Sequence, residues 1–177
     1  MLTFNKLGRI GRLGNQMFQI ASTIGIANRL GYDFAFPEWK NYDHADKGFL
    51  DDIEIQKYFI NPLPRIDHEL PEVHVPWGYH HVNVGPNVSL NGHMQSEEYF
   101  KHCHQLVRHY FQMEFHPPIE ATAIHIRLGD YDGEYHPLMK LEYYEKAMSL
   151  LPKMPYIIFS DDIGLARHIF GDDHTYS

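Results

Sequence analysis

Three short segments of the sequence combine glycine with polar side chains in patterns that could bind an anionic ligand. The first, residues 11–16, reads Gly-Arg-Leu-Gly-Asn-Gln and precedes an apolar pattern of helical period. Glycine has no Cβ, so this backbone could approach a ligand closely, and the N–H groups that begin a helix suit an anion. The spacing is neither that of a dinucleotide-binding loop nor that of a P-loop. A tight turn that packs a helix on a sheet is therefore the structural alternative.

The second segment, residues 125–130, reads His-Ile-Arg-Leu-Gly-Asp and follows a strand of buried type. Alternation along the strand places His125 and Arg127 on one face and Ile126 on the other. The guanidinium of Arg127 is a planar, permanently charged fork of donors that matches a diphosphate. An ion pair between Arg127 and Asp130 across the turn is the structural alternative.

The third segment, Ser160-Asp161-Asp162, ends a second strand and begins a helix. Either carboxylate could cap that helix, or could accept hydrogen bonds from a nucleotide base or a sugar. In open parallel sheets, ligands bind beyond the carboxyl ends of the strands. All three segments occupy predicted strand-to-helix loops, and we interpret them as parts of a ligand site.

The elements that must position these segments are those of an α/β protein. A strand, a glycine turn, a helix and a second strand open the chain, which predicts a parallel βαβ unit. Asn15 is the expected cap of that helix and Gly31 its expected stop. The predicted strands are 2–7, 33–36, 73–75, 88–91, 121–126 and 155–159, and the predicted helices are 16–30, 96 up to the prolines at 117 and 118, 141–151 and 163–170.

The two consecutive prolines predict a boundary between two domains, residues 1–117 and residues 118–177. The second domain would contain two strands and two helices. Its sheet would then end on an unpaired edge.

Composition excludes several classes of protein. The net charge of −8, from 23 acidic and 15 basic residues, is the opposite of a nucleic-acid footprint. The single cysteine, Cys103, rules out an internal disulfide and favours a reducing compartment. The 14 histidines show no zinc-type spacing, so we expect no metal site. No apolar run approaches the roughly 20 residues of a membrane span, and no secretory signal is visible.

Several stretches together resemble the α-1,2-fucosyltransferases, known as glycosyltransferase family 11. That resemblance implies a glycosyltransferase-B-like α/β fold: a Rossmann-like N-terminal domain on the acceptor side, followed by a Rossmann-like donor domain. The family continues past the position of Ser177, so the donor domain is expected to be incomplete here. The stretches lie in the family's order: GRLGNQMFQIAS at 11–22, LNGHMQSEEYF at 90–100, AIHIRLGDY at 123–131, LEYYEKAM at 141–148 and PYIIFSDDI at 155–163.

The resemblance also implies a reaction, the inverting transfer of fucose from GDP-fucose to a galactose hydroxyl of a glycan, in α-1,2 linkage. Neither a metal nor another cofactor is obligatory in that family. With no span or signal, the expected location is the cytoplasm, in solution or at the inner membrane face where lipid-linked glycans are built. The implied roles are pyrophosphate binding and catalysis for Arg127, a place near the reacting centre for Asn15, guanine recognition for His125 and one of Asp161 and Asp162, and donor-loop positions for Gly14, Gly129 and Asp130.

Two alternatives stay open at this stage. Protein O-fucosyltransferases share the glycine loop and the His-x-Arg element, although MQSEEYF and FSDDI favour the glycan enzyme. The other alternative is a non-catalytic module that binds a nucleotide or a glycan and needs a partner chain. Leu128 favours it, because the family usually has a second Arg at that position.

Overall fold

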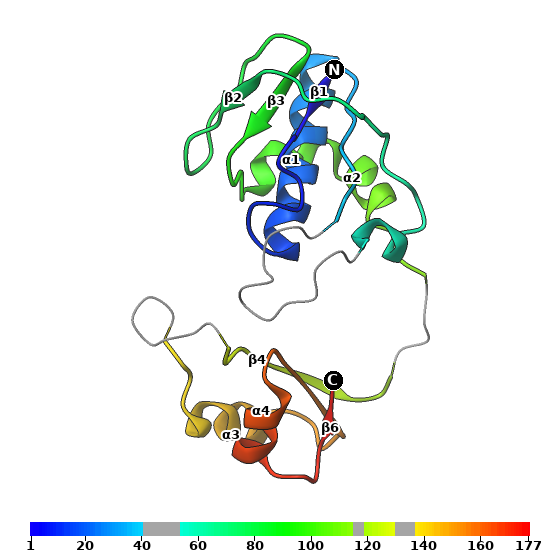
Figure 1. Ribbon diagram of the computed structural model, residues 1–177. Helices are drawn as coiled ribbons and strands as arrows, with labels where there is room; N and C mark the ends of the chain where they lie inside the picture. The colour runs from blue at the N-terminus through cyan, green and yellow to red at the C-terminus, as the bar shows by residue number, and fades with distance from the viewer. Residues whose placement is uncertain (41–53, 115–118, 130–136) are drawn as a thin grey trace. The chain divides into compact units, whose positions relative to one another are not determined.

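The computed structural model describes residues 1–40, 54–114, 119–129 and 137–177. They form a mixed α/β protein that divides into two compact units, Met1–Phe115 and His116–Ser177, each with a three-stranded parallel sheet (Figure 1). The sequence-based boundary lies between residues 117 and 118. We call these the N-terminal and C-terminal units and describe each by itself.

The sheet of the N-terminal unit has the strand order β1-β3-β2, with all neighbours parallel. On the other side of β1, isolated parallel bridges join Leu2 to Phe34 and Phe36 to Arg65. The segments at Phe34 and Arg65 therefore lie on one side of β1, and β3 and β2 lie on the other. The topology reverses between β1 and β3. The strands are β1 (Leu2–Thr3), β2 (Glu72–His74) and β3 (Val88–Asn91).

Helix α1 (Leu13–Leu30) supplies much of the core of this unit. Ile20 and Ile24 are wholly buried, at a spacing that places them on one side of the helix. They belong to the same core cluster as Leu2 of β1 and Leu90 of β3. Gly31 ends the helix in the left-handed conformation, with φ of 70°, as the sequence predicts.

The predicted continuous helix after Ser96 is wrong, although its predicted start is confirmed. The Ser96 hydroxyl accepts a hydrogen bond from the Glu98 N–H at 3.3 Å. Beyond it the backbone packs on α1 at Gly25, where an added Cβ would lie 2.2 Å from the Tyr99 carbonyl oxygen. This tertiary contact outweighs helix propensity, so the segment folds in short pieces. They are the 3₁₀ turns η3 (Glu97–Tyr99) and η4 (Lys101–Cys103) and the helix α2 (His104–Tyr110).

The C-terminal unit has the strand order β4-β5-β6, again all parallel. Both predicted strands are present, as β4 and β5, but the expected number of two strands is wrong because β6 was not predicted. Strand β6 has only two residues, too few to show a strand pattern in the sequence. It is recognised by its pairing with β5, in which Thr175 lies opposite Ile157. The elements are β4 (Thr122–Ile126), α3 (Leu141–Ser149), β5 (Tyr156–Ser160), α4 (Ile163–Phe170) and β6 (Thr175–Tyr176).

A small apolar core joins the sheet and helices of this unit. Ile158 and Ala166 are wholly buried, and the cluster also contains Ile124 and Ile126. The rings of Tyr144 in α3 and Phe170 in α4 meet edge to face at 5.4 Å. The two helices therefore pack on each other as well as on the sheet.

Candidate functional site

Helix α1 begins at Leu13, earlier than Gln16, where the sequence predicts its start. Arg12, with φ of −90° and ψ of −177°, is the residue before the helix, and its side chain makes no capping bond. Asn15 lies in the first helical turn, so its predicted role as the cap is wrong. Gly11 explains the shift, because its φ of 72° turns the chain into the helix. A Cβ on Gly11 would lie 2.3 Å from Nδ2 of Asn15, so the turn folds directly against this side chain.

Two buried glutamines of α1 hold the glycine loop in place. Gln16 donates through Nε2 to the Gly11 carbonyl at 3.0 Å, and Gln19 donates to the Ile10 carbonyl at 3.1 Å. The Gln16 carbonyl oxygen accepts from the indole N–H of Trp39 at 2.7 Å. The Gln16 amide therefore uses both its donor and its acceptor, and buried hydrogen bonds of this kind favour a single backbone conformation. Sequence reasoning missed these residues, and the available signal was two glutamines on the apolar face of a helix.

Asn15 is joined to a segment far away in the sequence. The Gln95 amide donates a hydrogen bond to Oδ1 of Asn15. The contact is reinforced nearby, since the Ser22 hydroxyl donates to the Met94 carbonyl at 2.8 Å. Met94 has a positive φ of 49°, a conformation that costs energy for a residue with a side chain. Two of the segments that carry the family resemblance, 11–22 and 90–100, therefore lie side by side.

The Asn15–Gln95 junction lies where the topology of the sheet reverses. The glycine loop and α1 follow β1, Gln95 follows β3, and these two strands are parallel neighbours. Ligands of open α/β sheets bind outside the carboxyl ends of the strands at such a reversal. Gly14, next to Asn15, is exposed, and an added Cβ would meet no atom within 4 Å. The N-terminal unit therefore offers open space beside Asn15.

In the C-terminal unit, the structure brings the two predicted loops together. Residues 127–129 follow β4 and residues 160–162 follow β5, with Ile126 paired to Ser160. The Leu128 N–H donates to Oδ1 of Asp161 at 2.7 Å. A Cβ on Gly129 would lie 3.2 Å from the other oxygen of Asp161, so the loop passes close to this carboxylate.

The two aspartates at the end of β5 have different structural roles. Asp162 caps α4, because its Oδ1 accepts from the Leu165 N–H at 2.9 Å. Its own N–H donates to the Ser160 hydroxyl at 3.1 Å, which closes the turn. Asp161 instead shapes the neighbouring loop. The capping alternative that the sequence offered thus describes Asp162.

The alternation expected around Arg127 is present in the strand. His125 is exposed, Ile126 is 2% exposed, and Arg127 follows β4 as a half-buried residue. Leu128 packs its side chain against the apolar cluster of this unit. Asp130 lies outside the described residues, and so does the ion pair that it could form with Arg127.

No model of a known protein family matches the chain, and no curated protein matches it.

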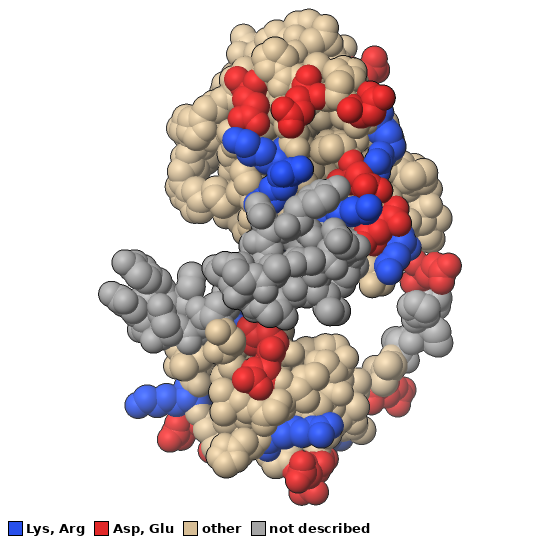
Figure 2. Space-filling view, viewed as in Figure 1, with Lys and Arg blue, Asp and Glu red and all other residues tan. Residues whose placement is uncertain are grey.

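The described residues also bear on the binding of metal ions, membranes and nucleic acids. Among them, no cluster of three or more His, Cys, Asp or Glu side chains could hold a metal ion. No helix within the described ranges combines the length and hydropathy needed to cross a bilayer. On the face seen in Figure 2, Lys and Arg side chains lie among Asp and Glu side chains rather than in a separate basic area. This mixture agrees with the net charge of −8.

Proposed function

We propose that this protein is a GDP-fucose-dependent fucosyltransferase of the glycosyltransferase-B kind, which transfers fucose with inversion to a galactose hydroxyl in α-1,2 linkage. The observation that carries the proposal is the hydrogen bond between Leu128 and Asp161. It fixes the loop that begins with Arg127 at the carboxyl edge of a parallel sheet, where α/β proteins bind nucleotides. The family resemblance of the surrounding residues supplies the identity of the nucleotide sugar.

The donor half of the site would use Arg127 and the backbone of its loop. GDP gathers negative charge as it leaves, so fixed donors aimed at the pyrophosphate stabilise the transition state. A guanidinium is suited to this task because it stays charged and can bind two oxygens at once. His125, exposed on the same strand, would contact the guanine. Asp161 has a second oxygen with which it could accept from the guanine N–H groups.

The reacting half of the site would be the Asn15–Gln95 junction. Because Gln95 donates to Oδ1 of Asn15, the Asn15 amide group is oriented with Nδ2 available as a donor. That donor could bind the oxygen of the acceptor or of the transferred sugar. The proposed location is the cytoplasm, in solution or at the inner face of the membrane.

The test is a transfer assay with radiolabelled GDP-fucose and a β-galactoside, with and without EDTA. With a complete donor domain, we expect a labelled disaccharide whose fucose is linked to the galactose 2-hydroxyl, and equal rates in EDTA, since the proposed mechanism uses no metal. Transfer that depends strictly on Mn²⁺ or Mg²⁺ would contradict the metal-free mechanism. Transfer of another sugar in preference to fucose would contradict the donor assignment.

A second candidate is a non-catalytic module that binds the nucleotide and acts with a partner chain. The position of Leu128 favours it, because this side chain is packed in the apolar cluster where the family usually has a second Arg. GDP binding at the Arg127 loop without any transfer would support this candidate. Absence of both GDP binding and transfer would contradict both.

A further inference from the structure

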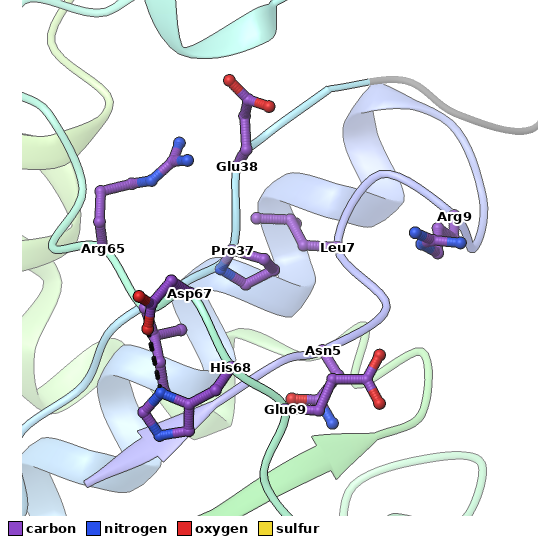
Figure 3. Close-up of a pocket in the computed structure, with 10 residues that line it drawn as sticks. Asn5, Leu7, Arg9, Pro37, Glu38, Arg65, Asp67, His68 and Glu69 are labelled. Carbon is purple, nitrogen blue, oxygen red and sulfur yellow. Dashed lines mark hydrogen bonds and ion pairs between the residues drawn. The ribbon is translucent and has the colours of Figure 1, made fainter.

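Figure 3 shows an open cavity of the N-terminal unit, with a volume of about 290 Å³, whose lining includes neither Asn15 nor Gln95. Its walls come from three parallel neighbours, at the point where each has just ended. Residues 5–9 follow β1, Pro37 and Glu38 follow the bridged segment at Phe36, and residues 65–69 begin at Arg65, which is bridged to Phe36. This is the carboxyl edge of the sheet, the same edge that carries the glycine loop.

The walls of the cavity are fixed by hydrogen bonds that do not use its charged groups. Asn5 donates to the Leu70 carbonyl at 2.8 Å and accepts from the Leu70 N–H at 3.3 Å. The Ile66 N–H donates to the Phe36 carbonyl at 3.0 Å, and the Phe36 N–H donates to the Pro64 carbonyl at 2.8 Å. The cavity is therefore formed before any ligand arrives, which lowers the entropic cost of binding.

Charged side chains of both signs line the cavity, and two of them have no bonding partner among the described residues. Within the described part of the chain, the Arg65 guanidinium and the Glu69 carboxylate make no hydrogen bond or ion pair. Glu38 pairs with Lys40 at 3.0 Å. Asp67 accepts from Nδ1 of His68 at 3.1 Å, and this hydrogen bond lowers the pKa of Asp67. Arg9, just before the glycine loop, completes the charged lining (Figure 3).

This combination excludes most classes of ligand. Three carboxylates against two guanidinium groups do not give the positive potential that an anion needs. The guanidinium groups repel a cation, and the polar walls do not suit an apolar ligand. A sugar ring fits all of these groups, because each hydroxyl can donate to a carboxylate and accept from a guanidinium. Pro37, with the buried Leu7 and Ile66 beside it, offers an apolar surface for the C–H faces of the ring.

We propose that this cavity binds one sugar ring of a neutral glycan, held by Arg65 and Glu69, and that it is a subsite for the acceptor. The acceptor role rests on the proposed function, whereas the binding of a sugar ring does not. Arg9 and the glycine loop after it connect the two places, because Arg9 lines the cavity and Gly11 packs on Asn15. A glycan held here would extend along the edge of the sheet towards the reacting half of the site.

The test titrates the protein with methyl β-D-galactopyranoside and with lactose, and separately with GDP, by calorimetry or NMR. Arg65→Ala and Glu69→Ala remove groups that have no partner among the residues the structure describes, so both variants should fold. Each should weaken galactoside binding at least about fivefold, a fraction of what a charged hydrogen bond can contribute. GDP binding should not change. Arg108→Ala, which removes an exposed arginine outside the cavity, is the matched control and should change neither.

Four outcomes would overturn the proposal. The first is that the parent protein binds neither galactoside. The second is that phosphate or acetate binds in place of the sugars and is lost in Arg65→Ala. The third is that Trp77→Ala, which removes a side chain 74% exposed on another loop, abolishes galactoside binding while Arg65→Ala does not. The fourth is that Arg108→Ala weakens galactoside binding as much as Arg65→Ala does. Loss of GDP binding alone would contradict the proposed function and leave the sugar subsite standing.

Discussion

The backbone N–H of Leu128 donates a 2.7 Å hydrogen bond to the carboxylate of Asp161, 33 residues further along the chain. A bond of this length to an ionised acceptor is stronger than a bond between neutral groups. It sets the path of the loop after β4 by means of a residue after β5. Asp161 is therefore a positioning residue for Arg127, whatever it contributes to the ligand directly.

The first prediction separates the two neighbouring aspartates. Asp161→Ala should weaken GDP binding at least about tenfold, because the loop loses a hydrogen bond to a charged group, worth about 1.5–3 kcal/mol. Asp161→Asn keeps an oxygen acceptor and should weaken GDP binding less. Asp162→Ala removes a helix cap and should lower the free energy of unfolding by about 1 kcal/mol, with a smaller effect on GDP. Calorimetry and urea unfolding would measure both, and a larger effect of Asp162→Ala on GDP binding would contradict these roles.

The second prediction concerns the planar fork of Arg127. Arg127→Lys keeps the charge but loses bidentate binding, so in an enzyme with a complete donor domain it should lower kcat/KM at least about tenfold, which is about 1.4 kcal/mol. Steady-state rates with GDP-fucose measure the effect. Arg167→Lys, in α4 of the same unit, is the control and should have little effect. Unchanged kinetics in Arg127→Lys would contradict the assignment.

The third prediction concerns Asn15. Asn15→Ala should leave the thermal midpoint of unfolding almost unchanged, because Asn15 does not cap α1 and alanine favours a helix. Turnover should fall far more than GDP affinity. Gln95→Ala should reproduce part of the loss, and the double variant should lose less than the sum of the single variants, since the two side chains act as a pair. Fully additive losses, or loss of GDP binding with a normal rate per bound site, would contradict this role.

The fourth prediction uses the space beside Gly14. Gly14→Ala should keep or slightly raise stability, because the new Cβ meets no protein atom and alanine is the better helix former. GDP-fucose turnover should nevertheless fall if a ligand occupies that space. Gly25→Ala is the structural contrast: its Cβ would lie 2.2 Å from a backbone oxygen, and it should cost at least about 2 kcal/mol of stability. Full activity in Gly14→Ala would remove Gly14 from the site.

Local signals predicted part of this structure well. Strand β3 and helix α4 begin and end at the residues that the sequence indicates, because the pattern of each is bounded by turn or capping residues. The Ser96 hydroxyl bond and the left-handed Gly31 were predicted for the same reason. These features depend on a few adjacent residues, so a sequence contains all the information about them.

Contacts between distant residues were not predictable in this way. The turn at Gly11 moves the start of α1 ahead of Asn15, and packing on Gly25 breaks the expected helix after Ser96. The cavity also escaped prediction, because residues 65–69 lie in a proline-rich stretch without a regular pattern. Parallel pairing alone brings that stretch, the end of β1 and Glu38 to one edge of the sheet.

The measurement that tests the central claim most directly is a titration of the ¹⁵N-labelled protein with GDP, followed amide by amide by NMR. The account predicts that GDP shifts the amides of Leu128 and Gly129 and those of the first turn of α4. It also predicts that UDP shifts them less and that Arg127→Ala suppresses the change. An unchanged spectrum, equal shifts with UDP, or shifts confined to residues away from these two loops would contradict the account.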